Sequence, residues 1–227
     1  MDEPLWYDES KGLPILMLYS VVDDRSGVCY QEYRNVHGED AGNALRFLFN
    51  AMSPKSDPDV PFQGIPHMIY MDNGPIARSR VFQSVMKYLG IDVKVHMPDS
   101  KDKRRKTARS KGKVERAFRT VKECHEVLYH LREPKNEVEA NQMLSDYLKK
   151  YNDHQHRAEP HSRMEDWLQN IDGAVKQMCS WERFSSFARE PEKRKVGIDA
   201  RIPVDGSVYE VDPDLAGEQV VLWWGLF

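Results

Sequence analysis

The pattern of hydrophobic and polar positions predicts a mixture of strands and helices. Runs typical of strands, either continuously apolar or alternating, lie at 5–7, 13–23, 28–36, 65–71 and 91–95. Apolar residues recur at helical spacing over 39–52, 81–89, 114–131 and 138–151. Turn residues at 23–27 join the second and third strands into a hairpin, and Gly90 is expected to end the second helix. This order predicts an α/β fold, a mixed five-stranded sheet flanked by helices.

The last part of the chain has a different pattern. Short β-like runs separated by turn residues predict a small all-β module from about residue 195 onward. We therefore expect three segments: a core over 1–170, a helical and charged linker over 171–194, and the β module over 195–227. Trp223, Trp224 and Phe227 are read as core residues of this module in preference to a base-stacking role.

Charge is unevenly distributed along the chain. The net charge is −3, yet eight Lys or Arg residues lie between positions 101 and 113. Such a local positive field attracts a polyanion even when the total charge is slightly negative. Three scattered cysteines form no zinc-ligand pair, and no apolar run approaches the length of a membrane span or signal segment, so we expect an intracellular protein without membrane partners.

Two acidic residues lie at positions typical of a catalytic site. Asp72 follows the apolar run Ile69–Met71 and precedes Asn73, so it is expected at the carboxyl end of a buried strand. Glu115 is expected on the opening turn of a helix, with Lys111, Arg119 and Lys122 along the same helix face. Carboxylates that bind hard metal ions beside a phosphate-binding surface are the parts of a metal-dependent phosphoryl-transfer site.

In combination, these motifs resemble the catalytic core of the retroviral integrase and DDE transposase superfamily, in its bacterial insertion-sequence branch. The resemblance rests on 22–27 at the hairpin, 71–75 around Asp72, 110–120 around Glu115, and the downstream segment 151–167. It implies an RNase H-like fold over roughly residues 2–170. The two acidic residues are 43 positions apart, and the basic segment 101–109 accommodates this long spacing.

The resemblance also implies a third carboxylate on the first strand. Asp2 is favoured, because antiparallel pairing around a turn near Ser10 places it opposite the end of the second strand. Asp8 would lie in that turn, and a position upstream of Met1 is the remaining alternative. Asp23 and Asp24 belong to the hairpin turn and are read as structural.

The activity implied by the resemblance is DNA cleavage and strand transfer, as in DNA integration and transposition. Asp2, Asp72 and Glu115 would hold Mg²⁺ or Mn²⁺, with two ions expected, and the partners would be transposon ends, target DNA and further copies of the chain. Candidate phosphate contacts are Arg104, Arg105, Lys111, Lys113, Arg116, Arg119 and Lys122. The expected location is the bacterial cytoplasm, in association with the nucleoid.

The ends of the chain leave two other hypotheses open. No helix-turn-helix segment precedes the core, and the chain stops at Phe227 directly after a strand, so both ends are expected to be cut and the β module to be incomplete. The β module resembles the barrel that follows the core in Mu-type transposases. An inactive remnant that only binds DNA or a transposase partner is the main alternative, and a structure-selective nuclease that never joins ends is a weaker one.

Overall fold

A computed structural model describes residues 15–38, 40–95, 108–155, 159–171, 175–204 and 206–227. The chain divides into two compact units, Met1–Cys179 and Ser180–Phe227. The division lies within the segment that we expected to be a linker. No helix in the described ranges is long and apolar enough to cross a bilayer.

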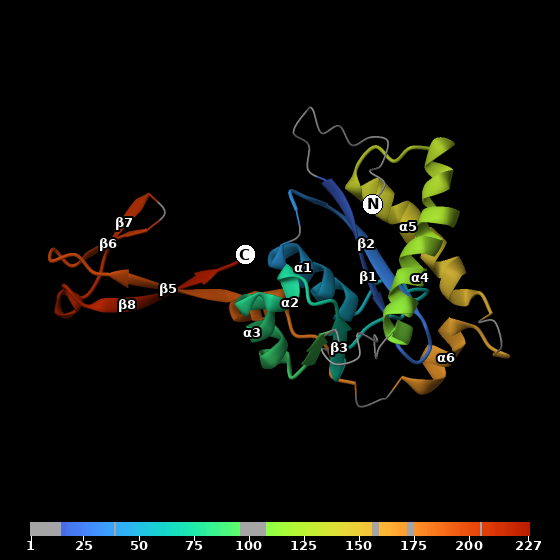
Figure 1. Ribbon diagram of the computed structural model, residues 1–227, viewed down its shortest axis with the longest axis horizontal. Helices are drawn as coiled ribbons and strands as arrows, with labels where there is room; N and C mark the ends of the chain where they lie inside the picture. Colours follow the sequence, from blue (N-terminus) through green and yellow to red (C-terminus); the bar gives the residue numbers. More distant parts are fainter. Residues whose placement is uncertain (1–14, 39, 96–107, 156–158, 172–174, 205) are drawn as a thin grey trace, which may run out of the picture. The chain divides into compact units, whose positions relative to one another are not determined.

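The first unit is built on a long hairpin (Figure 1). Strands β1 (Ile15–Val22) and β2 (Cys29–Val36) pair antiparallel over their full lengths. Both strands lie where the apolar runs predicted them. The expected strand at 5–7 lies outside the described residues.

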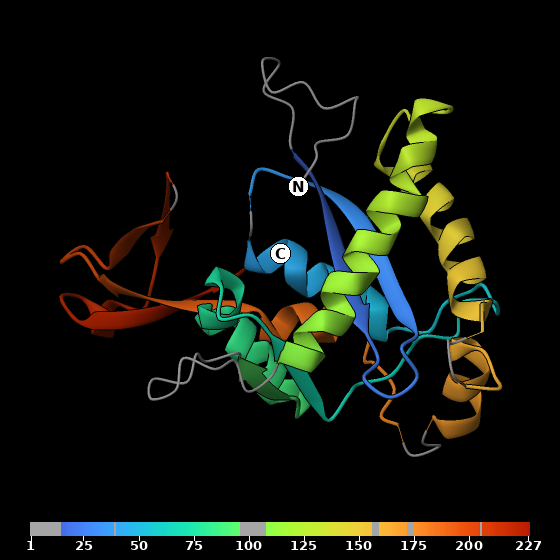
Figure 2. The same cartoon turned by 45° about the vertical axis from the view of Figure 1, so that its right-hand side comes forward.

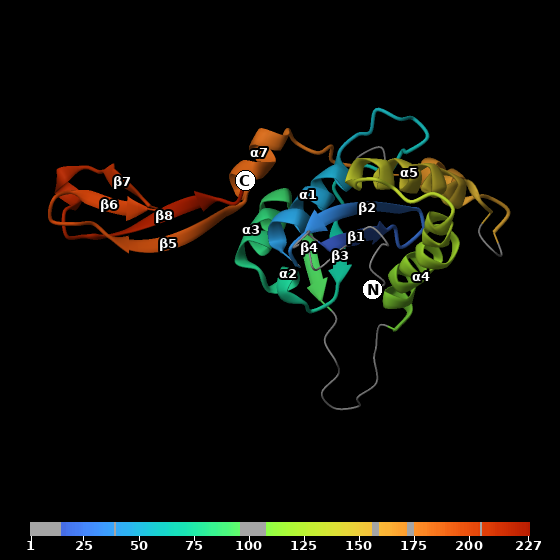
Figure 3. The same cartoon turned by 90° about the horizontal axis from the view of Figure 1, so that it is seen from above.

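A second pair of strands is parallel. β3 (Met68–Met71) pairs with β4 (Asp92–Val95), as seen from above in Figure 3. The connection between them holds α2 (Pro75–Arg78) and α3 (Arg80–Leu89). Gly90 ends α3 in the left-handed conformation, with φ of 76°, as expected for a glycine at a helix C-terminus. In the described part of this unit the strands form two two-stranded sheets, and not one continuous sheet of five strands.

Helices cover both faces of the hairpin. On one face, α4 (Ala108–Cys124), the 3₁₀ turn η2 (Glu126–His130) and α5 (Glu137–Asp153) bury a cluster with β1 and β2. Figure 2 shows α4 crossing this face, with α5 alongside it. On the other face, α1 (Ala41–Met52) and α6 (Arg163–Asn170) contribute to a chain of aromatic rings. Its members, in contact order, are Tyr19, Phe47, Tyr30, Phe62 and Trp167.

The structure corrects the single helix that we expected over 114–131. Ala117 and Val121 are buried as the helix packs on β1, but α4 ends at Cys124. Leu128 and Leu131 follow that end and are 48% and 86% exposed. Because the chain turns into η2, the side chains that it buries there are His125 and Tyr129 instead.

The second unit contains α7 (Trp181–Phe187), the 3₁₀ turn η3 (Pro213–Leu215) and four strands. β5 (Arg189–Lys195) pairs with β8 (Gln219–Gly225), and β6 (Arg201–Val204) pairs with β7 (Ser207–Glu210), both antiparallel. The charged stretch Arg189–Lys195, which we had expected in the linker, is thus a strand. Val196, Ile202 and Val204 form the small core.

Candidate functional site

Asp72 directly follows β3 and is exposed. Since β3 and β4 are parallel, their carboxyl ends lie at the same edge of the pair, and Asp72 stands at that edge. Gly74 then caps α2, and Pro75 occupies its first position, which suits a residue that has no N–H to donate. The Asn73 side chain accepts a hydrogen bond from Nε of Arg78 at 3.1 Å, which ties the turn after Asp72 to the helix that follows.

Glu115 lies on α4 and is exposed. The helix begins at Ala108, so Glu115 is in its third turn and not on its opening turn as we had expected. The buried residues Ala117 and Val121, on the adjoining turns, fix α4 against β1. The hairpin therefore supports the helix that carries Glu115.

The structure describes some of the expected phosphate contacts and not others. Arg116 and Arg119 are exposed and Lys122 is half-buried, all on α4. Arg119 also forms an exposed ion pair with Glu123 at 3.9 Å, a contact that contributes little to stability. Lys111 and Lys113 lie on the first turns of α4. Arg104, Arg105 and Asp2 lie outside the described residues.

A carboxylate set of this kind suits Mg²⁺ or Mn²⁺, which prefer oxygen ligands. In the described ranges, no three His, Cys, Asp or Glu side chains are grouped closely enough to hold a metal ion. The expected third ligand, Asp2, and its alternative, Asp8, are both outside those ranges. The donor chemistry of Asp72 and Glu115 fits the ion, and the full set stays a prediction.

A buried histidine directly follows the last residue of α4 and joins this helix to the rest of the core. His125 is only 3% exposed, and its ring stacks on Tyr147 at 5.0 Å between centroids. Its Nε2 is 3.0 Å from the hydroxyl of Tyr129. Burial lowers the pKa of His125 to about 4, so the ring is neutral at pH 7. No motif or spacing in the sequence singles out His125 as a buried residue.

Two asparagines of α5 bind the outer edge of β2. The side-chain amide of Asn152 accepts from the Cys29 N–H at 3.0 Å and donates to the Cys29 carbonyl at 2.9 Å. Asn141 makes the same two contacts with Tyr33, at 2.7 and 2.8 Å. Each amide thus replaces the peptide group of a neighbouring strand, and α5 blocks an edge that would otherwise be open to pairing. Sequence reasoning missed this arrangement, because it depends on contacts more than 100 residues apart.

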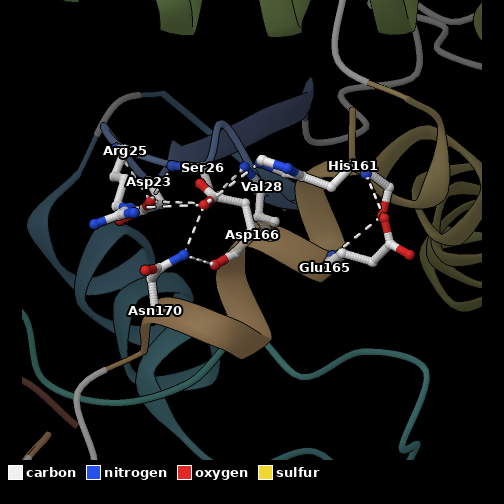
Figure 4. A network of polar contacts seen from close by, with 9 residues as sticks. Asp23, Arg25, Ser26, Val28, His161, Glu165, Asp166 and Asn170 are labelled. Atoms are coloured by element: carbon white, nitrogen blue, oxygen red, sulfur yellow. Dashed lines mark hydrogen bonds and ion pairs between the residues drawn. The ribbon is translucent and has the colours of Figure 1, made fainter. Parts of the chain in front are cut away.

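The hairpin turn is held by local hydrogen bonds, as the structural reading of Asp23 predicted (Figure 4). One carboxylate oxygen of Asp23 accepts from the N–H of Arg25 and from both the N–H and hydroxyl of Ser26, at 2.7–3.1 Å. On α6, Asp166 lies within 3.7 Å of Arg25 and of His161 and connects that helix to the turn. Asp23 is therefore engaged in the turn.

A cavity of about 550 Å³ lies between β2, the loop after α1, and α5. Its cations are already engaged: Lys149 pairs with Asp57 at 2.5 Å and Arg34 with Glu32 at 3.3 Å. Lys55 donates to the carbonyls of 51, 53 and 62, and burial lowers its pKa to about 8. These contacts join β2, the loop after α1 and α5 along the cavity wall.

Comparison with known proteins agrees with this architecture. An intasome chain of simian T-cell lymphotropic virus, solved in complex with the PP2A regulatory subunit B56 gamma, is similar over 93% of this chain and 62% of its own, at a TM-score of 0.53 and 19% identity. The catalytic core domain of BIV integrase is similar over 69% of this chain and 86% of its own, at a TM-score of 0.50 and 20% identity. At these identities the likeness shows the fold, that of an RNase H-like integrase core.

Two sequence matches add to the structural likeness. The Pol polyprotein of Radiation murine leukemia virus (strain Kaplan) is 45% identical over 60 residues, which are 26% of this chain and 9% of the polyprotein. The model of the TnsB C-terminal domain matches residues 6–129, more than half of the chain and a range that includes Asp72 and Glu115. The chain therefore belongs to the TnsB C-terminal domain family, within the transposases and integrases.

Proposed function

We propose that the protein is a transposase or integrase that cleaves DNA and joins strands by in-line phosphoryl transfer, with Asp2, Asp72 and Glu115 as its catalytic carboxylates. One observation carries the proposal. The family match spans both Asp72 and Glu115, and each is exposed on an element that the core holds in place. Asp72 directly follows β3, and Glu115 lies on the helix that packs against β1.

In this proposal the three carboxylates hold two Mg²⁺ or Mn²⁺ ions. When bound, the ions supply Lewis-acid activation of the attacking oxygen and stabilisation of the leaving oxygen. Asn73 orients the turn after Asp72 through its hydrogen bond with Arg78. Arg116, Arg119 and Lys122 contact phosphates along the DNA, with Lys111, Lys113, Arg104 and Arg105 extending the same basic surface. Contacts of this kind position DNA without reading its sequence, and they weaken as salt rises.

The proposal extends to the parts that the described residues leave open. A first strand carrying Asp2 completes a five-stranded sheet, and the second unit is a Mu-type β-barrel. The partners are transposon ends, target DNA and further copies of this chain in an oligomer assembled on DNA. The protein acts on DNA in the bacterial cytoplasm, in association with the nucleoid.

The proposal is tested by strand transfer with paired variants. Asp72→Asn and Glu115→Gln each remove a charge and keep the side-chain shape, and each is expected to lower the rate by at least about 100-fold, a typical cost of removing one stabilising group. The controls are Asp92→Asn on β4 and Glu123→Gln two turns further along α4, both exposed, which are expected to keep the parental rate. Full activity of Asp72→Asn would refute the proposed site.

The alternative is an inactive remnant that only binds DNA, which applies if Asp2, a position outside the described residues, does not complete the carboxylate set. The same assay distinguishes it from the enzyme. A remnant binds DNA in a salt-sensitive manner with or without Mg²⁺, and shows no strand transfer in the parent protein.

A further inference from the structure

The β5–β8 ribbon of the second unit has two unlike faces. Side chains alternate between faces along a strand, so the register separates them into two sets. The inner set packs on the small core and includes Val220, Leu222 and Trp224 from β8. Glu192 lies on this inner face, where it accepts from Nε1 of Trp224 at 2.7 Å and pairs with Arg194 at 2.8 Å.

The outer set combines an exposed indole with uncompensated positive charge. Trp223 is 61% exposed, which corrects the expectation that it lies in the core. Its cross-strand partner is Pro191, and its diagonal neighbours are Arg189 and Lys193. Gly225 lies opposite Arg189 and has no side chain to cover the indole. Lys195 continues the same face.

The charges of this outer face are unopposed. Both glutamates of β5 fall in the inner set by alternation, and β8 carries no acidic residue. Elsewhere in the unit, Arg194 and Arg201 each have an acidic partner at 2.8 Å. Over the described ranges, no salt bridge is formed by Arg189, Lys193 or Lys195. Three cations without a carboxylate favour a polyanionic partner.

The exposed indole of Trp223 favours a partner that offers a flat ring as well as negative charge. Phosphates alone satisfy Arg189, Lys193 and Lys195, but an exposed tryptophan gains most from a flat ring stacked on it. Grooves that bind single-stranded nucleic acid combine these two elements, a positive track for the backbone and an aromatic platform for the bases. In duplex DNA the base faces are covered by their neighbours, so only an unpaired base can stack on Trp223.

We propose that the outer face of the β5–β8 ribbon binds single-stranded DNA, with an unpaired base stacked on Trp223 and the flanking phosphates bound by Arg189 and Lys193. This site goes beyond the proposed phosphoryl transfer and does not depend on Asp72 or Glu115. It gives the second unit a function of its own, the capture of unpaired strands.

The test uses the whole chain in EDTA, which removes any contribution from a bound metal ion. Fluorescence anisotropy measures binding to labelled oligothymidine and to a duplex of equal length. Trp223→Ala is expected to weaken oligothymidine binding about tenfold, within the range for loss of one stacked base, and to change duplex binding less than about twofold. Trp223→Tyr keeps an aromatic platform and is expected to retain most of the affinity. Oligothymidine is also expected to quench tryptophan emission in the parent and not in Trp223→Ala.

The charge contribution is tested with neighbouring residues on opposite faces. Lys193→Gln is expected to lower the slope of log affinity against log salt by about 0.7, the loss of one phosphate contact on a single strand. Arg194→Gln removes the same charge from the inner face and is expected to leave the slope unchanged.

Three results would overturn the proposal. The first is parental oligothymidine binding by Trp223→Ala, and the second is an equal loss on single strands and duplex. The third is loss of binding to anionic phospholipid vesicles in Trp223→Ala with oligothymidine binding unchanged, which would assign the face to a lipid surface. Each leaves the strand-transfer assay of Asp72 unaffected, so the two proposals fail separately.

Discussion

Replacing Asn152 by alanine tests whether α5 holds the hairpin through side-chain amides that take the place of a neighbouring strand. Asn152 is 6% exposed, and its amide makes two hydrogen bonds with the backbone of Cys29, at 3.0 and 2.9 Å. The change removes both bonds and leaves a buried N–H and a buried carbonyl without this partner. Each unsatisfied buried group costs about 1–3 kcal/mol, and partial access of water reduces the sum. We expect a loss of about 3 kcal/mol in the free energy of unfolding.

The assay is urea unfolding followed by circular dichroism. With a slope of about 2 kcal/mol per molar urea, the midpoint should fall by about 1.5 M. Hydrogen exchange at the Cys29 amide gives a local readout, and exchange is expected to be faster in the variant.

Asn170→Ala is the matched control for this experiment. Asn170 also makes two hydrogen bonds, with the carbonyl and a carboxylate oxygen of Asp166, at 2.9 and 2.8 Å, but it is exposed. Its loss is expected to cost no more than about 0.5 kcal/mol, since water replaces the bonds. Equal costs for Asn152→Ala and Asn170→Ala would refute the reasoning.

Other predictions concern the protonation of His125 and the room for a side chain at two glycines. The pKa of His125 is about 4 in the folded protein and near 6.5 when unfolded, so its contribution to stability is present above pH 6.5 and is lost as pH falls toward 4. Between pH 7 and 5 the parent should therefore lose about 1–2 kcal/mol more unfolding free energy than His125→Gln, and parallel pH profiles would contradict this. Gly64→Ala should destabilise by at least about 2 kcal/mol, because φ is +97° and the added Cβ would lie 2.1 Å from Cγ1 of Val175. Gly74→Ala, with nothing within 4 Å, should unfold at the parental urea concentration, and equal losses for the two glycines would refute this account.

Local patterns predicted the elements on which the candidate site stands. Alternation and turn chemistry placed β1 and β2, and the glycine signal placed the end of α3. The apolar run before Asp72 placed β3, although only its last four residues pair with β4. These features depend on a few neighbouring residues, so they are visible in a sequence.

Other features depend on distant contacts and could not be predicted. The Asn152 contact with Cys29 joins residues 123 positions apart, and no periodicity encodes it. Leu128 and Leu131 continued the helical spacing of α4, but a change to 3₁₀ geometry in η2 turned them outward. Arg189–Lys195 lacks the apolar alternation of a strand because both of its faces carry charged residues, and β5 forms through pairing with β8.

Calorimetric titration with Mn²⁺ tests the central claim most directly. The account predicts that the protein binds Mn²⁺, that Asp72→Asn abolishes the binding, and that Asp92→Asn on the neighbouring strand leaves it unchanged. Binding of Mn²⁺ by Asp72→Asn with parental affinity would contradict the account, since the carboxylate at the end of β3 would then not be a metal ligand.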